Sequence, residues 1–125
     1  MSPTEKPSQH GHGQPIRIGR RFLAVPPGYD QPLDPALTPI RLESGKVFGS
    51  GAHPTTQLCL AALERHLRPG AALLDLGAGT GILAIAAAKL GAAEVLALDT
   101  DAEAVRVARA NCAANGVAGQ VSVEK

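Results

Sequence analysis

The chain has 125 residues, 45% of them hydrophobic, and a formal net charge of +1. This length suits one domain with a modest core. The near-zero charge argues against a duplex nucleic-acid binder, which carries a basic face. Aromatic residues make up only 2% of the chain, which argues against a base-stacking platform. We therefore expect no direct binding of nucleic acid.

The first 15 residues are mostly polar, Pro and Gly, and they predict a disordered tail without a signal peptide. The longest apolar run, "GILAIAAA", is too short to span a bilayer. The spacing of Cys59 and Cys112 fits no metal site, and both are expected to be small core residues with free thiols. The sequence thus predicts a cytoplasmic protein without a metal ion or a membrane partner.

A strand-rich lead-in segment is expected over residues 16–46. Residues 16–25 predict a strand with a bend at Gly19, and residues 26–35 predict a proline-rich loop. Residues 40–43 alternate like a second short strand.

The rest of the chain, residues 47–125, begins with a glycine-rich turn and a helix. Pro54 suits the first turn of this helix, where its missing N–H has no partner to lose. The helix is expected to end near Leu67, before "RPG". Its apolar face is predicted from the spacing of four residues: Leu58, Ala61, Ala62 and Leu67.

Three apolar strands then alternate with two helices. The strands are expected at 72–76, 94–99 and 120–124, and the helices at 82–91 and 102–114, with Asp101 or Thr100 as N-cap of the second. Right-handed crossovers make the strands parallel, in the spatial order three-two-one. The fold class is therefore α/β and Rossmann-like, with the ligand at the carboxyl ends of the strands.

The loop between the first of these strands and its helix has glycine at every second position: Gly77, Gly79 and Gly81. Glycines allow a sharp turn and a close approach of backbone to ligand. In the dinucleotide fingerprint, G-x-G-x-x-G, the third glycine comes one position later, where this chain has Ile82. The spacing therefore disfavours an NAD-linked oxidoreductase.

Counted from Asp75, the loop follows the pattern D-x-G-x-G-x-G, which resembles the first motif of class I S-adenosylmethionine-dependent methyltransferases. The resemblance implies S-adenosyl-L-methionine as cofactor. It places Asp75 near the cationic amino-acid end, Asp99 on the ribose hydroxyls and Thr100 beside the adenine. The loop residues Gly77, Ala78, Gly79 and Gly81 would lie between these ends. A purely structural turn and a solvated Asp99 are the alternatives.

The preceding segment, "FGSGAHPTTQLCLAALE" (48–64), resembles the F-G-[ST]-G-x-H-P-T-T signature of the ribosomal protein L11 methyltransferase family. Residues 16–27 and 40–51 resemble that family's entry into its catalytic domain, so the resemblance covers about residues 16–125. It implies that six residues line the methionine end of the cofactor: Phe48, Gly49, Gly51, His53, Thr55 and Thr56. From the residues alone, "HPTT" favours a helix start capped by a threonine, and only the family resemblance favours cofactor contact.

The resemblance implies a protein methyltransferase that acts on a lysine or another amino group, with a ribosomal protein as substrate. The alternatives are a methyltransferase for another protein or a small molecule, and an inactive fragment that binds cofactor. No residue is an evident base, so the catalytic residues stay unassigned. In the family, groups that hold the acceptor follow a fourth strand and a separate amino-terminal domain recognises the substrate, and this sequence shows neither.

A three-stranded sheet that stops before a fourth strand leaves residues 72–76 with an unpaired apolar edge. Such an edge invites pairing with another chain, so we expect the chain either to self-associate or to be completed by another polypeptide.

Overall fold

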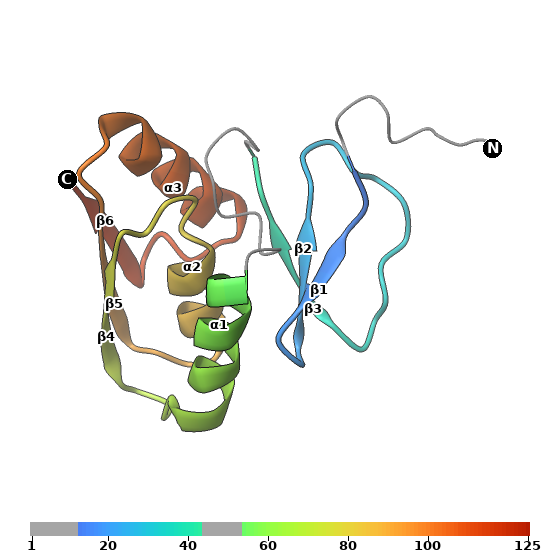
Figure 1. Cartoon of the computed structure of the whole chain (residues 1–125), viewed down its shortest axis with the longest axis horizontal. Coiled ribbons are helices and arrows are strands. Elements are labelled where there is room, and N and C mark those ends of the chain that lie inside the picture. Colours follow the sequence, from blue (N-terminus) through green and yellow to red (C-terminus); the bar gives the residue numbers. More distant parts are fainter. Residues whose placement is uncertain (1–12, 44–53) are drawn as a thin grey trace.

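A computed structural model describes residues 13–43 and 54–125. It contains two three-stranded sheets and three helices, arranged along the chain as shown in Figure 1. The elements are β1 (Ile16–Ile18), β2 (Phe22–Val25), β3 (Thr38–Arg41), α1 (Pro54–His66), β4 (Ala72–Leu76), α2 (Ile82–Lys89), β5 (Glu94–Leu98), α3 (Ala102–Ala114) and β6 (Val121–Glu124). Among the described residues, no helix has the length and apolarity required to cross a membrane.

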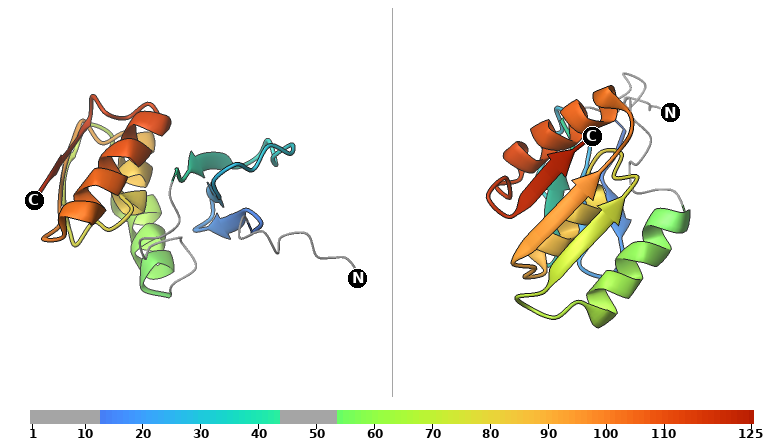
Figure 2. Two further views of the ribbon diagram at one scale, coloured as in Figure 1. Left: turned by 90° about the horizontal axis from the view of Figure 1, so that it is seen from above. Right: turned by 90° about the vertical axis from the view of Figure 1, so that its left-hand side faces the viewer.

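The main sheet consists of β4, β5 and β6 in that order, and every pair is parallel. This confirms the predicted α/β class and the predicted strand order. Figure 2 shows that the helices lie on one side of this sheet and leave its other side open. The predicted boundaries of the strands and of α3 agree with the structure to within one residue.

The short helix α2 is the centre of the core. Six of its eight residues are buried: Ile82, Ala84, Ile85, Ala86, Ala87 and Ala88. In Figure 1, α2 lies between the main sheet and the lead-in sheet, so neighbours cover opposite sides of it. A helix that is apolar all round requires such an environment. The alanines make it thin enough for both layers to approach closely.

Helix α3 starts as the sequence predicts, with Asp101 rather than Thr100 as N-cap. The Asp101 side chain accepts a hydrogen bond from the Glu103 backbone N–H at 3.1 Å. The face of α3 that carries Val105, Ala108 and Cys112 is buried, which confirms the expectation that Cys112 is a core residue. Burial raises the pKa of the Cys112 thiol to about 11, so this cysteine is uncharged at neutral pH.

The lead-in sheet differs from the prediction of one bent strand over residues 16–25. Those residues form two antiparallel strands, β1 and β2, joined by a tight turn at 19–21, and β3 pairs parallel to β2. The turn is stabilised from outside, because the Glu64 carboxylate of α1 accepts the backbone N–H groups of Arg20 and Arg21 at 2.8–3.0 Å.

Of the four residues predicted for the apolar face of α1, only Leu67, which directly follows the helix, packs against the core. Leu58 is 72% exposed, and both Ala61 and Ala62 are also exposed. The face that packs into the core contains the fully buried Leu60, together with Leu63 and Leu67. Two polar side chains of α1 explain the difference. The Gln57 side chain accepts a hydrogen bond from the Gly19 N–H, and the Glu64 carboxylate accepts the other N–H groups of the turn between β1 and β2. These hydrogen bonds fix the rotation of α1 about its axis. The same rotation exposes Cys59, which was expected in the core.

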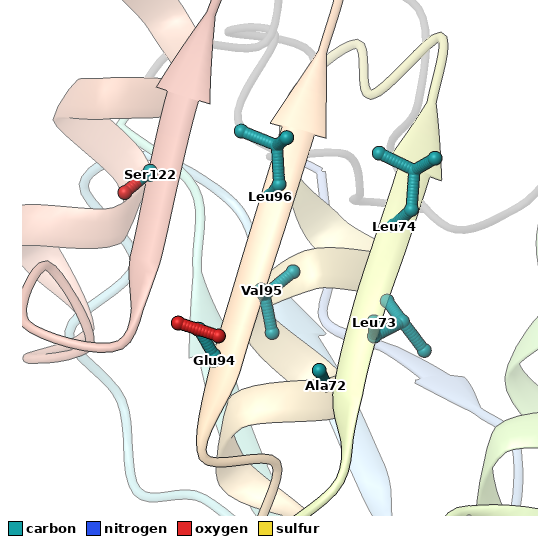
Figure 3. A pocket seen from close by; sticks show the side chains of 7 residues that line it. All are labelled: Ala72, Leu73, Leu74, Glu94, Val95, Leu96 and Ser122. Carbon is teal, nitrogen blue, oxygen red and sulfur yellow. The ribbon is translucent and has the colours of Figure 1, made fainter.

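The open side of the main sheet, which we call the outer face, is apolar. Leu74 and Leu76 of β4 are 56% and 70% exposed, and Leu96 of β5 is 40% exposed. A hollow of about 550 Å³ lies on this face, where Figure 3 shows Leu74 and Leu96 on neighbouring strands. Among the described residues, β4 pairs with β5 alone, so its other edge is unpaired as predicted.

The hairpin contact gives a test of the fold. Replacing Glu64→Ala removes the acceptor of two backbone N–H groups and should lower the free energy of unfolding by about 1–3 kcal/mol. Replacing Arg106→Ala, which breaks an exposed ion pair with Glu103, should leave the free energy of unfolding nearly unchanged. Urea denaturation of both variants measures the difference, and equal losses would contradict this role of Glu64.

Candidate ligand-binding site

The glycine loop crosses from the end of β4 to the start of α2 and is attached to the end of β5. Gly77, Gly79 and Gly81 have positive φ angles of 72°, 56° and 86°. The N–H groups of Gly77 and Ala78 both donate to the Leu98 carbonyl, at 2.8 and 3.0 Å. The loop thus follows a backbone path that favours glycine, directly above the carboxyl ends of the strands.

Gly81 has a second constraint besides its φ angle. A Cβ at this position would lie 3.3 Å from the Cβ of Ala108, so α3 packs directly against the loop. A Cβ on Gly77, by contrast, would meet nothing within 4 Å. The loop is therefore closed on the side of α3 and open above Gly77.

Asp99 directly follows β5, and hydrogen bonds hold its carboxylate against the glycine loop. Its Oδ2 accepts the N–H of Gly79 at 2.9 Å, and its Oδ1 accepts the N–H of Asp101 at 3.0 Å. These backbone hydrogen bonds hold the pKa of Asp99 below its usual value, so the group is anionic at neutral pH. Each carboxylate oxygen can accept a further hydrogen bond from a ligand.

Asp99 lines a hollow of about 400 Å³, together with Leu76, Gly77, Leu98, Thr100 and Lys125. We call it the Asp99 hollow. Its walls are mostly apolar apart from the carboxylate and Lys125. Such a lining fits a flat, partly apolar group that also presents hydroxyl donors.

Asp75 lies in β4 on the side that the helices cover. Its Oδ2 atom is buried and has no hydrogen-bond partner among the described residues. Burial, and secondly the negative charge of Asp99, raise the pKa of Asp75 from 3.8 to about 6. A buried carboxylate oxygen without a partner is costly, so it indicates a site for a donor that comes from a ligand or water.

The Asp75 carboxylate lines a second hollow, of about 350 Å³, between α1, the loop and α2. We call it the Asp75 hollow. Its other lining residues are Thr55, Thr56, Cys59, Leu76, Gly77, Ala78, Gly79, Ile82 and Leu83. None of these carries a positive charge, so the hollow favours a cationic group. A pyrophosphate here would lie between two carboxylates, and the resulting repulsion disfavours a dinucleotide.

The structure brings most of the predicted site residues together around these two hollows. Gly77 lines both hollows and so joins them. Gly81 lines neither, because it faces α3, and Asp101 is occupied as an N-cap. The predicted contacts Phe48, Gly49, Gly51 and His53 lie outside the described residues.

Four apolar lining residues were missed by the sequence analysis: Leu76, Ile82, Leu83 and Leu98. Leu76, Ile82 and Leu98 are next to a motif residue and Leu83 is two positions after Gly81, so position along the chain was the available signal. Cys59 was missed because it was assigned to the core.

Comparisons with known proteins place the chain in a family. The family model described as ribosomal protein L11 methyltransferase (PrmA) matches residues 7–125. Ribosomal protein L11 methyltransferase of Pelotomaculum thermopropionicum is 47% identical over 110 residues, which are 88% of this chain and 36% of that protein. The Chloroflexus aurantiacus protein of the same name is 52% identical over 108 residues, 86% of this chain and 33% of that protein.

Solved structures give the same result for the fold. Ribosomal protein L11 methylase from Lactobacillus delbrueckii subsp. bulgaricus superimposes with a TM-score of 0.78 at 38% identity, over 91% of this chain and 57% of that one. Trypanosoma brucei PRMT1, in an enzyme–prozyme complex with AdoHcy, superimposes with a TM-score of 0.51 at 32% identity, over 54% of this chain and 22% of that one.

The α/β fold of the main sheet is therefore the Rossmann-like fold of methyltransferases. The chain spans about a third of the length of the curated relatives it matches. Because the family model covers nearly the whole chain, the chain belongs to the ribosomal protein L11 methyltransferase family.

Proposed function

We propose that residues 47–125 form part of the S-adenosyl-L-methionine-binding domain of a methyltransferase that modifies amino groups of a ribosomal protein in the cytoplasm. The observation that carries the proposal is the buried, unpartnered Oδ2 of Asp75 on one side of the glycine loop, with the anionic Asp99 on the other. The relatives' names supply the substrate class, ribosomal protein L11.

The residues present fit this cofactor at both of its ends. The ammonium group suits Asp75, since it brings the positive charge and the donors that the buried oxygen lacks. The ribose hydroxyls suit Asp99, whose oxygens keep acceptor capacity beside Gly79 and Asp101. Thr100 and Leu98 line the part of the Asp99 hollow proposed for the adenine.

Four residues complete the proposed contacts from the family signature: Phe48, Gly49, Gly51 and His53. Thr55 and Thr56, at the start of α1, line the Asp75 hollow next to them in sequence. Together they would enclose the methionine end of the cofactor.

The cofactor, when bound, supplies the activated methyl group. The protein's task is then to align donor and acceptor and to exclude water. Ile82 and Leu83 give the Asp75 hollow an apolar wall that serves the second task. No lining residue of either hollow is an evident base, so no catalytic residue is assigned.

A chain that binds cofactor without turnover is the second candidate, since both described hollows hold cofactor-type contacts and none for an acceptor amine. Methylation of purified ribosomal protein L11 with radiolabelled cofactor separates the two. Label transfer would support the enzyme, and binding without transfer would support the second candidate.

We also propose that a second copy of the chain pairs with the outer face and the free edge of β4. The edge strand "ALLDL" carries neither Lys nor Pro, the residues that usually protect such edges. Leu74, Leu76 and Leu96 supply the exposed apolar area beside it.

Self-association is tested by changing the outer face alone. Leu74→Lys should shift the chain towards the monomer in sedimentation velocity, because it places a charge in the apolar contact. Leu58→Lys is the control: Leu58 is 72% exposed but lies on α1, so its replacement should leave the distribution unchanged. A wild-type chain that is monomeric at all concentrations would refute the proposal.

Cofactor binding is tested by calorimetric titration with S-adenosylhomocysteine and with NAD. We expect only the first to bind, and Asp99→Ala to weaken it by about 1–3 kcal/mol, the scale of a lost charged hydrogen-bond partner. Glu94→Ala, at the opposite end of β5, is the matched control and should leave affinity unchanged. Binding of NAD, or an unchanged affinity in Asp99→Ala, would overturn the assignment.

The raised pKa of Asp75 predicts a specific pH dependence. Below its pKa of about 6 the carboxyl group is protonated, and an ammonium ligand must first displace that proton. Affinity for S-adenosylhomocysteine should therefore fall roughly tenfold from pH 7 to pH 5. Asp75→Asn should bind weakly at both pH values and lack this dependence. An unchanged wild-type affinity across this pH range would show that Asp75 does not contact the ammonium group of the ligand.

A further inference from the structure

The most fully buried polar side chain outside the two hollows is Asn111 of α3, with no exposed surface. Both ends of its amide are paired with backbone. Its Oδ1 accepts the N–H of Glu43 at 2.6 Å, and its Nδ2 donates to the Thr80 carbonyl at 2.8 Å. Glu43 follows the lead-in strand β3, and Thr80 belongs to the glycine loop. One side chain thus joins two regions that are distant in sequence.

Asn115, one turn further along α3, contacts the same strand but not the loop. Its amide exchanges two hydrogen bonds with the backbone of Arg41, at 2.8 and 2.7 Å. The side chains of both asparagines therefore form hydrogen bonds with backbone groups in β3 or just after it, where the backbone of a neighbouring strand would otherwise bind. They differ in burial, since Asn111 is fully buried and Asn115 is half-buried, and only Asn111 continues the connection to the loop.

We propose that Asn111 is a positioning residue that couples the end of the lead-in sheet to the glycine loop and so sets the affinity for the cofactor. The ligand in this statement rests on the proposed function. The coupling itself rests on the two hydrogen bonds of a fully buried amide.

The attachment point at Thr80 explains how the coupling acts. The peptide group that joins Thr80 to Gly81 is planar, and it is held on both sides: its C=O accepts from Asn111 and its N–H donates to Ala78. Two residues before Gly81, the N–H of Gly79 donates to the Asp99 carboxylate. Fixing the Thr80 peptide therefore fixes the part of the loop that orients the Asp99 carboxylate.

The coupling can be tested without any ligand. Glu43→Pro removes the N–H that Asn111 accepts, at an exposed position, and also restricts the backbone at Leu42 and Glu43, whereas Glu43→Ala keeps that N–H as the control. Amide hydrogen exchange of Gly79 and Gly81 should become roughly fivefold faster in Glu43→Pro, while exchange at Val95 in the main sheet stays unchanged. Unchanged exchange in the loop would overturn the coupling.

The effect on affinity is tested with the two asparagines. Asn111→Ala should weaken S-adenosylhomocysteine binding roughly five- to tenfold, and Asn115→Ala less than about twofold, although both variants lower thermal stability. Equal weakening in the two variants would mean that stability alone is measured, and it would overturn the proposal.

If Asn111→Ala does not fold, the affinity of Glu43→Pro against Glu43→Ala decides the same question, with the same roughly fivefold loss expected. A wild-type chain that binds no S-adenosylhomocysteine would instead refute the proposed function. The exchange experiment would still decide whether Asn111 couples the two regions.

Discussion

The attachment of the glycine loop to the end of β5 is the constraint on which the site depends. Two N–H groups of the loop share the Leu98 carbonyl, and a third binds the Asp99 carboxylate. This arrangement requires positive φ angles that favour glycine, and it needs a close approach to α3 at Gly81. Because the loop is held from β5, the two acidic residues that end the neighbouring strands lie on either side of it, at the carboxyl edge of the sheet.

The same loop gives these two carboxylates different surroundings, and their pKa values shift in opposite directions. Backbone N–H groups stabilise the charge on Asp99 and lower its pKa. Asp75 receives no such bond at its buried oxygen, and the fixed charge of Asp99 adds to the burial that raises its pKa. The Asp99 carboxylate is therefore charged at neutral pH and partly solvated, whereas that of Asp75 gains most from a ligand that brings a positive charge. A ligand with an ammonium at one end and hydroxyls at the other meets both requirements.

The sequence predicted the features that depend on local pattern and missed those that depend on distant partners. Strand order, the boundaries of α3 and its Asp101 cap follow from periodicity, chirality and capping rules. The turn at 19–21 and the rotation of α1 were missed because they depend on Glu64, more than 40 residues from the turn. In the candidate site, the motif located Asp75 and Asp99, but the unpaired oxygen and the role of Asn111 appear only when three elements meet.

Strand β4 connects the outer face with the site. Side chains alternate along it, so Asp75 points towards the helices while its neighbours Leu74 and Leu76 point outward. A partner that covers the two leucines and pairs with the free edge would restrict the backbone that carries Asp75, and Leu76 itself lines both hollows. Covering the outer face would therefore do more than bury apolar surface: it would stiffen the strand that positions the carboxylate for the ligand's charge.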